Sequence, residues 1–166
     1  MRKPAPSDLL LHPLAISRVI AAASLLAIGG VHLQQYIVQD YRVIPTIGPL
    51  FLLNFIAGTV LGVYFLVPAR ARVGRVRFLL DTLAALSGLG VAVGGFAALL
   101  VSEHTPLFGF MEHGYRFAIV FTIASEGVAI VVLGIFLGLS LGTNRQGRRR
   151  RPNLDGPMTV TPVPES

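Results

Sequence analysis

The chain has 166 residues, of which 53% are hydrophobic and 13% are charged, and its formal net charge at pH 7 is +6. So little charge cannot solvate the surface of a soluble globular protein, and several apolar runs are too long for a soluble core, so the composition indicates one compact helical unit in a membrane. The sequence contains no cysteine, which excludes structural disulfides, zinc–thiolate sites and thiol catalysis.

Four apolar runs follow one another along the chain, and each is long enough to cross a bilayer core as a helix, which takes roughly 20 residues. A short basic segment, 1–13, precedes the first run and should lie at the membrane surface. A basic, proline-rich tail, 143–166, follows the last run and has no apolar periodicity, so we expect it to be disordered. We therefore predict an all-α fold, a polytopic four-helix bundle with a membrane domain over 14–142 and spans at about 14–38, 47–67, 78–101 and 117–141.

Basic residues are distributed unequally between the two sides that this topology creates. One side receives Arg2, Lys3, the arginines between spans two and three, and the cluster after span four, whereas only Arg42 and Arg116 fall on the other. Because the side rich in arginine and lysine stays in the cytoplasm, the sequence predicts a multi-pass protein of the cell membrane with both termini cytoplasmic. The run 148–151 could bind anionic lipid or nucleic acid; we favour a topology signal that also contacts lipid head groups, with no nucleic-acid partner.

Small residues recur at helical spacing on the spans and share faces with polar side chains. Small residues allow close approach of helix backbones, which is one way in which membrane helices associate. We therefore expect the polar groups inside the bundle and the third span contacted from two directions. The glycines predicted to pack helices are Gly58, Gly62, Gly88, Gly90, Gly94, Gly95, Gly134 and Gly138.

Polar residues inside the spans fall at two depths, at about 1.5 Å of helix per residue. Arg18 and Asp81 lie near the cytoplasmic ends of spans one and three, where they could form an ion pair, although Arg18 could instead extend to the head groups. His32, Asn54 and Glu126 lie on three different spans at a similar distance from the outer side. The sequence predicts that these three side chains converge inside the bundle.

The role of this second group stays open between two interpretations. The three side chains could hydrogen-bond one another and hold the helices together, which is a common role of polar residues in membrane helices and the one we favour. Alternatively, they could form a proton, metal or ligand site, because histidine titrates near neutrality and a carboxyl group deep in a membrane is costly unless it is paired, hydrated or protonated.

The outer connections contain further carboxylate and imidazole groups: Glu103, His104, Glu112 and His113. Such groups can bind divalent metals, and haem ligation between His32 and an outer histidine is conceivable in a bundle. No regular ligand spacing occurs, however, so we expect no metal site and no cofactor. The sequence also lacks a nucleophile elbow, a phosphate-binding loop and a dinucleotide fingerprint, and an enzyme is not expected.

Residues 32–54, HLQQYIVQDYRVIPTIGPLFLLN, resemble uncharacterised small four-helix membrane proteins of actinobacteria, which carry a histidine late in the first helix and a YR-x-IP-x-IG-x-LF-x-L signature leading into the second. The whole chain is similar to DoxX-like proteins in architecture alone. These resemblances imply an integral membrane protein without a named activity. We expect a structural or accessory component that associates with itself or a larger membrane complex; the alternative is a small proton- or cation-linked carrier or sensor that uses His32, Asn54 and Glu126.

Overall fold

The computed structural model describes residues 6–67, 74–109, 111 and 117–149, and within them the protein is a bundle of long α-helices. The helices are α1 (Pro6–Val38), α2 (Ile47–Leu66), α3 (Arg75–His104) and α4 (Phe117–Arg149), and a short 3₁₀ turn, η1 (Tyr41–Val43), joins α1 to α2. All four helices are long and apolar enough to cross a membrane. The predicted all-α, four-helix membrane fold is confirmed, and the chain is a multi-pass membrane protein.

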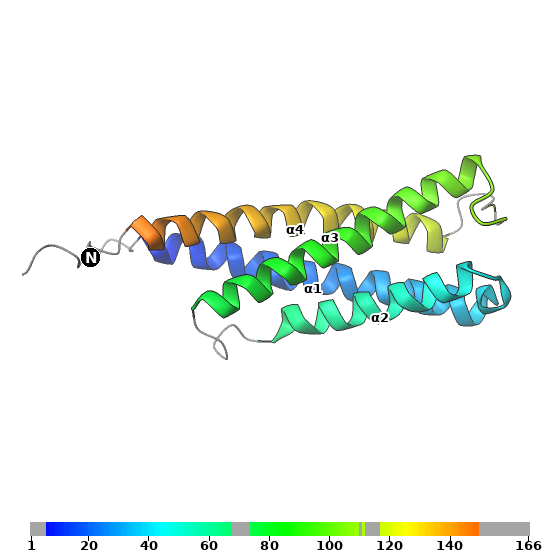
Figure 1. The fold of residues 1–166 in the computed structure, drawn as a ribbon, viewed down its shortest axis with the longest axis horizontal. Coiled ribbons are helices and arrows are strands. Elements are labelled where there is room, and N and C mark those ends of the chain that lie inside the picture. The colour runs from blue at the N-terminus through cyan, green and yellow to red at the C-terminus, as the bar shows by residue number, and fades with distance from the viewer. Residues whose placement is uncertain (1–5, 68–73, 110, 112–116, 150–166) are drawn as a thin grey trace, which may run out of the picture.

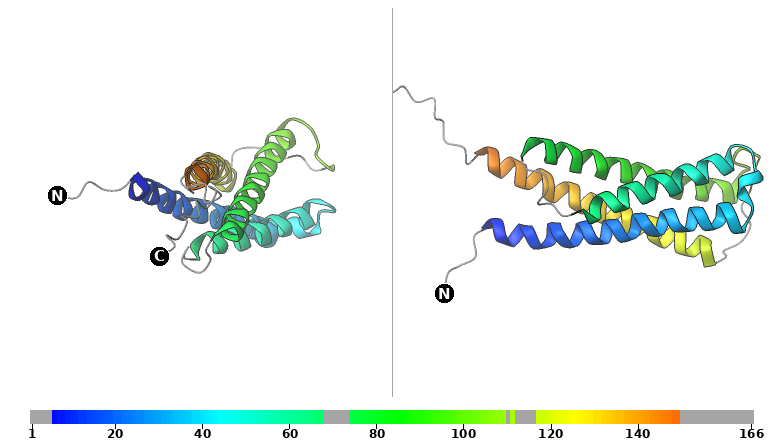
Figure 2. Two further views of the ribbon diagram at one scale, coloured as in Figure 1. Left: turned by 60° about the vertical axis from the view of Figure 1, so that its left-hand side comes forward. Right: turned by 90° about the horizontal axis from the view of Figure 1, so that it is seen from below.

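The helices run up and down, so that the start of α1 and the end of α4 lie at the same end of the bundle (Figure 1). We call this end the terminal end and the opposite one the η1 end. α1 packs along both α2 and α4, and α3 packs mainly along α4. α3 is tilted relative to α1 and α2, and it diverges from α2 towards the η1 end (Figure 2).

The first and last helices extend beyond the predicted spans. α1 begins at Pro6, within the segment expected to lie at the surface; proline suits the first position of a helix because its φ angle is already helical and its missing N–H would have no partner there. α4 continues to Arg149, which corrects our expectation that the disordered tail begins at 143. Hydropathy marks where a helix leaves the membrane, whereas a helix ends at a breaking residue, and the next proline is Pro152. Residues 150–166 lie outside the described part of the chain.

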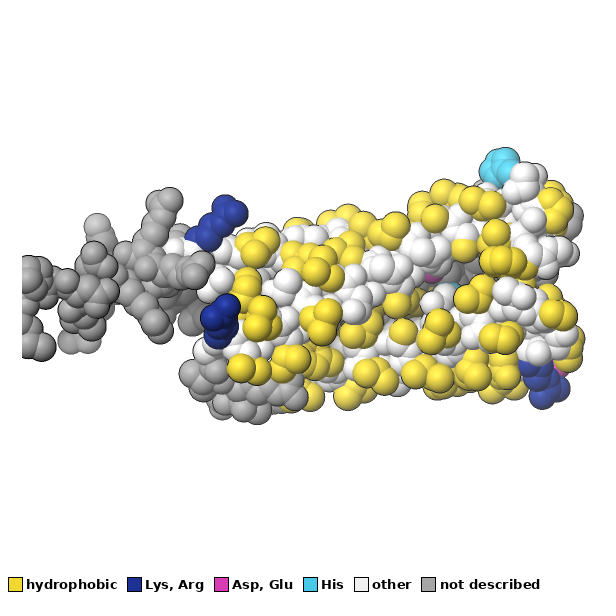
Figure 3. Space-filling model, in the orientation of Figure 1, with side chains coloured by type: hydrophobic (Ala, Val, Ile, Leu, Met, Phe, Trp, Pro, Cys, Tyr) yellow, Lys and Arg dark blue, Asp and Glu magenta, His cyan; other side chains and the backbone are white. Residues whose placement is uncertain are grey.

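The core of the bundle is a column of small and large apolar side chains, mostly from α1, α3 and α4, to which α2 adds Phe65. Leu25, Leu133 and Phe136 are fully buried, and buried alanines on α1, α3 and α4 let the helices come close. Many other large apolar side chains are exposed along the outside of the helices, where lipid would cover them (Figure 3). The charged side chains seen in Figure 3 lie almost entirely at the two ends, as a bilayer requires.

Close packing of α1 against α2 depends on glycine. A Cβ atom at Gly58 would lie 2.8 Å from the Leu25 carbonyl oxygen, and one at Gly29 would lie 3.1 Å from the Phe55 carbonyl oxygen. At Gly62 it would lie 2.7 Å from Leu26 Cγ. These contacts place Gly58 and Gly62 at the helix interface that the sequence predicted, and they add Gly29, which was not among the predicted packing glycines.

The predicted packing glycines on α3 and α4 do not all pack. Gly88 does, because a Cβ atom there would lie 3.0 Å from Leu133 Cδ1. In contrast, a Cβ atom at Gly90, Gly94, Gly134 or Gly138 would meet no described atom within 4 Å. The prediction that these four glycines pack helices of this chain is therefore wrong for its described part. Gly90 and Gly94 face the space that opens as α3 leaves α2, and Gly134 and Gly138 are on the exposed outside of α4.

Candidate functional site

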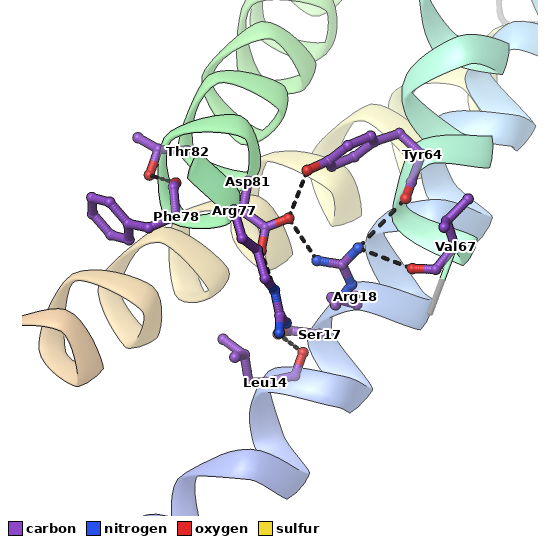
Figure 4. Close-up of polar contacts among 9 residues, drawn as sticks. All are labelled: Leu14, Ser17, Arg18, Tyr64, Val67, Arg77, Phe78, Asp81 and Thr82. Atoms are coloured by element: carbon purple, nitrogen blue, oxygen red, sulfur yellow. Dashed lines mark hydrogen bonds and ion pairs between the residues drawn. The ribbon is translucent and has the colours of Figure 1, made fainter. Parts of the chain in front are cut away.

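A network of charged and polar side chains connects three helices near the terminal end of the bundle (Figure 4). Arg18 Nη1 donates to Asp81 Oδ1 over 2.8 Å, and the Tyr64 hydroxyl donates to the same oxygen over 2.8 Å. The other carboxylate oxygen of Asp81 lies 3.4 Å from Nε of Arg77. Arg18 Nη2 lies 3.4 Å from the backbone oxygens of Tyr64 and Val67 at the end of α2. The network thus ties α1, α2 and α3 together.

Aromatic rings complete the surroundings of the Arg18 guanidinium. Its Cζ atom lies 5.8 Å from the ring centre of Tyr64, 5.4 Å from that of Phe65 and 5.9 Å from that of Phe136. These distances suit cation–π attraction. Arg18 is buried, so it does not extend to the head groups, and its paired charge is explained by helix packing without a ligand.

The other half of the bundle contains a cleft of about 330 Å³ between the diverging helices. Its walls are mostly apolar, with Val91, Ala98 and Leu99 from α3 and Ile119 from α4. Leu50 of α2 and the glycines Gly90 and Gly94 of α3 line it and are exposed, so the cleft opens sideways between α2 and α3. Figure 3 shows the surface hollowed at this place, with acidic and histidine side chains visible inside. The polar residues in the lining are His32, Gln35, Tyr41, Asn54, Ser102, Thr122 and Glu126.

Glu126 projects from α4 into this cleft and is fully buried, with 0% of its surface exposed. Both of its carboxyl oxygens lack a hydrogen-bond partner among the described residues. Gly95 of α3 makes room for this side chain, since a Cβ atom at Gly95 would overlap Glu126 Oε1. Gly95 therefore packs, as predicted, but against a carboxyl group.

His32 is held by both of its ring nitrogens. Nδ1 lies 2.8 Å from the Ile28 carbonyl oxygen, which can only accept, so Nδ1 carries the proton. Nε2 lies 3.2 Å from Asn54 Nδ2, and in the neutral ring it accepts a hydrogen bond from that amide. The ring of Phe51 packs against the imidazole with its centre 5.0 Å away. This pair links α1 to α2 across one wall of the cleft.

The structure therefore brings His32, Asn54 and Glu126 to one cleft but not into one hydrogen-bonded cluster. His32 bonds Asn54, whereas Glu126 bonds neither of them. Sequence reasoning missed the other polar lining residues, although Thr122 precedes Glu126 by one helical turn and Ser102 follows Gly95 by two. That spacing alone would have placed these hydroxyl groups on the faces that line the cleft.

The candidate metal ligands of the outer connections do not form a site in the described chain. Glu103 and His104 end α3, and His104 is exposed with Nδ1 placed 2.9 Å from the Leu100 carbonyl oxygen. Glu112 and His113 lie outside the described residues. Among the residues that the structure describes, no three histidine or carboxylate side chains are close enough to share a metal ion.

Comparison with known proteins adds no family. No protein-family model, no curated protein and no solved structure matches the chain. The resemblance of residues 32–54 to actinobacterial membrane proteins, and the architectural likeness to DoxX-like proteins, therefore stay predictions.

Proposed function

We propose that the protein is a carrier or sensor that binds a small, mainly apolar molecule in the cleft, with the polar group of that molecule at Glu126. One observation carries this proposal: a fully buried carboxyl group faces a cavity, and neither of its oxygens has a partner among the described residues. Buried polar groups in native proteins are nearly always hydrogen-bonded, and an exception calls for an explanation. A ligand in the cleft would supply the missing partner.

A packing role explains only part of the polar layer. His32 and Asn54 hydrogen-bond across α1 and α2 and so hold these helices together. Glu126 makes no side-chain hydrogen bond to a described residue, and an acidic side chain in the middle of a membrane helix costs about 3 kcal/mol on insertion scales. Its position is therefore better explained by binding than by the accessory role that the sequence favoured.

The size and position of the cleft fit a molecule that arrives through the lipid. Its volume of about 330 Å³ is at the lower end of the range for small-molecule sites, which is roughly 300 to 1,000 Å³. Its opening lies between α2 and α3, on the side of the bundle that lipid surrounds. An apolar molecule could enter there without crossing a layer of head groups.

We also propose that the protein lies in the cell membrane with its terminal end in the cytoplasm. Among the described arginines, Arg75, Arg77 and Arg145 belong to the terminal end and Arg42 to the η1 end. Under the positive-inside rule, this difference and the further arginines of the sequence favour cytoplasmic termini. The cleft would then lie in the outer half of the membrane.

A fluorescence assay tests the binding role with two substitutions: Phe51→Trp as the reporter and Gly94→Leu to fill the cleft. The chain contains no tryptophan, so Phe51→Trp places its single tryptophan in the lining of the cleft. In nanodiscs, bromoadamantane should quench this fluorescence in a saturable way, because bromine quenches tryptophan at short range. Gly94→Leu should abolish the saturable part, because the leucine side chain would occupy the cleft.

The control for this experiment is Gly134→Leu. Neither Gly94 nor Gly134 has a described atom within 4 Å of its Cβ position, so both substitutions spare the packing of the bundle, but only Gly94 lines the cleft. Saturable quenching should persist in the Gly134 variant. Quenching that is non-saturable in every variant, or unchanged by Gly94→Leu, would reject the binding role.

A further inference from the structure

We infer that the ligand of the cleft is an organic monocation: a compact, mainly apolar amine whose ammonium group pairs with Glu126. The inference rests on the proposed binding role and adds the chemical class of the ligand. It follows from the charges in the cleft, from its hydrogen-bonding groups and from the nature of its walls.

Among the described residues, the cleft contains an acidic group but no cationic group to pair with it. Three titratable side chains face it among the described residues: His32 from α1, Tyr41 from η1 and Glu126 from α4. The lining contributed by α2 and α3 contains none, and no described lysine or arginine lines the cleft. His32 has both nitrogens engaged in the neutral pattern, and Arg18 is committed to Asp81 in the other half of the bundle. The carboxyl group therefore has no counter-charge, and a cation would provide one.

Two hydroxyl groups that line the cleft can only accept hydrogen bonds from a ligand. Ser102 Oγ donates to the Leu99 carbonyl oxygen over 2.8 Å, and Thr122 Oγ1 donates to that of Ala118 over 2.8 Å. Each hydroxyl already donates its proton to a backbone carbonyl, so its oxygen can only accept a hydrogen bond from a ligand. Together with the two free oxygens of Glu126, they suit a ligand that donates several hydrogen bonds, as a protonated amine does.

The walls of the cleft do not suit magnesium or calcium. Magnesium and calcium take six or more oxygen ligands, and the described lining provides a single carboxylate among apolar side chains such as Val91, Leu99 and Ile119. An ammonium group on a hydrocarbon body satisfies both parts of the cleft, since the charge meets Glu126 and the hydrocarbon meets the walls.

The test uses the Phe51→Trp protein in phosphatidylcholine nanodiscs and three probes with one hydrocarbon cage: the amine, the alcohol and the carboxylate of bromoadamantane. Apparent affinity is read from tryptophan quenching. We expect the amine to bind roughly 10- to 100-fold more tightly than the alcohol, the range for a hydrogen bond to a charged group, and the carboxylate to bind least. Glu126→Gln should remove the preference for the amine and leave alcohol binding in place, whereas Glu126→Asp should keep part of the preference.

The probes separate failure of the inference from failure of the proposed function. Each probe is compared between the Phe51→Trp protein and the same protein with Glu126→Gln, in the same membrane. Partitioning of that probe into lipid is therefore equal in both measurements and cancels. Alcohol binding in the Glu126→Gln protein also reports that the cleft is intact. A ratio of amine to alcohol affinity that Glu126→Gln leaves unchanged would overturn the cation inference and leave the binding role standing. Saturable binding of none of the probes would overturn both.

An amine could reach the cleft as a free molecule or as a lipid head group. Repeating the amine titration with phosphatidylethanolamine in the nanodisc distinguishes the two sources. Competition by that lipid would support the inference with a head group as the natural ligand. Undiminished amine binding would support it with a free amine.

Discussion

Two carboxyl side chains within the membrane domain, Asp81 and Glu126, have opposite surroundings. Asp81 accepts hydrogen bonds from Arg18 and Tyr64 and lies close to Arg77, whereas Glu126 has no partner among the described side chains. The first is explained by the helices that it joins. The second has no partner in the part of the chain that the structure describes, and we propose that a ligand provides one.

Removing the charge of Asp81 should strongly destabilise the protein. Asp81→Asn would leave the buried Arg18 guanidinium without its counter-charge, and breaking a buried ion pair costs about 3 to 5 kcal/mol. Replacing both partners, by Arg18→Met with Asp81→Leu, should recover most of this loss, because no unpaired charge is left behind. Thermal unfolding in detergent, followed by circular dichroism, measures both effects.

The matched control is the ion pair between Asp40 and Arg42 at the η1 end. Its atoms are 3.0 Å apart, but its side chains are 64% and 57% exposed. Exposed pairs contribute about 0 to 1 kcal/mol, so Asp40→Asn should leave the melting temperature nearly unchanged. Similar losses for Asp40→Asn and Asp81→Asn would show that the inner network does not hold the bundle together.

At the scale of helices, periodicity identified the faces correctly but not what covers them. Residue spacing placed Gly90 and Gly94 on one face of α3, and the sequence could not show that α3 tilts away from α2 and leaves this face open. The tilt depends on side chains from several helices at once. The same limit applies to α4, where Gly134 and Gly138 share a face that no described helix contacts. By contrast, the start of α2 at Ile47 followed from local sequence, because Pro45 interrupts the preceding helix.

Alanine substitutions at Gly58 and Gly134 should have opposite effects on stability. A methyl group at Gly58 would press against the backbone of α1, which cannot move aside, and overpacking of this kind costs about 1 to 3 kcal/mol. A methyl group at Gly134 meets no described atom within 4 Å, and alanine favours the helix over glycine by roughly 0.5 to 1 kcal/mol. Melting temperatures of the two variants measure this contrast. A stabilised Gly58→Ala protein would contradict the close contact between α1 and α2.

At the scale of the whole molecule, the two polar regions lie in opposite halves of one bundle. The network around Arg18 and Asp81 holds α1, α2 and α3 together towards the terminal end, and from there α2 and α3 separate and enclose the cleft. The sequence predicted both the membrane fold and the two depths of polar residues, because hydropathy and the rise of a helix determine them. It could not predict the cleft, whose existence depends on the angle between two helices.

The side of the membrane on which the cleft lies follows from the proposed orientation. The start of α3 and the end of α4 both lie at the terminal end, and the sequence has clustered arginines around both, which resist transfer across the membrane. Reporter fusions after residues 42, 72, 108 and 150 should therefore give cytoplasmic signals at 72 and 150 and external signals at 42 and 108. An external reporter at 72 would contradict the orientation. Replacing Arg70, Arg72 and Arg75, which lie after α2 and up to the first residue of α3, with neutral residues should weaken the cytoplasmic signal at 72, since these charges, and not the apolar spans, determine the direction of insertion.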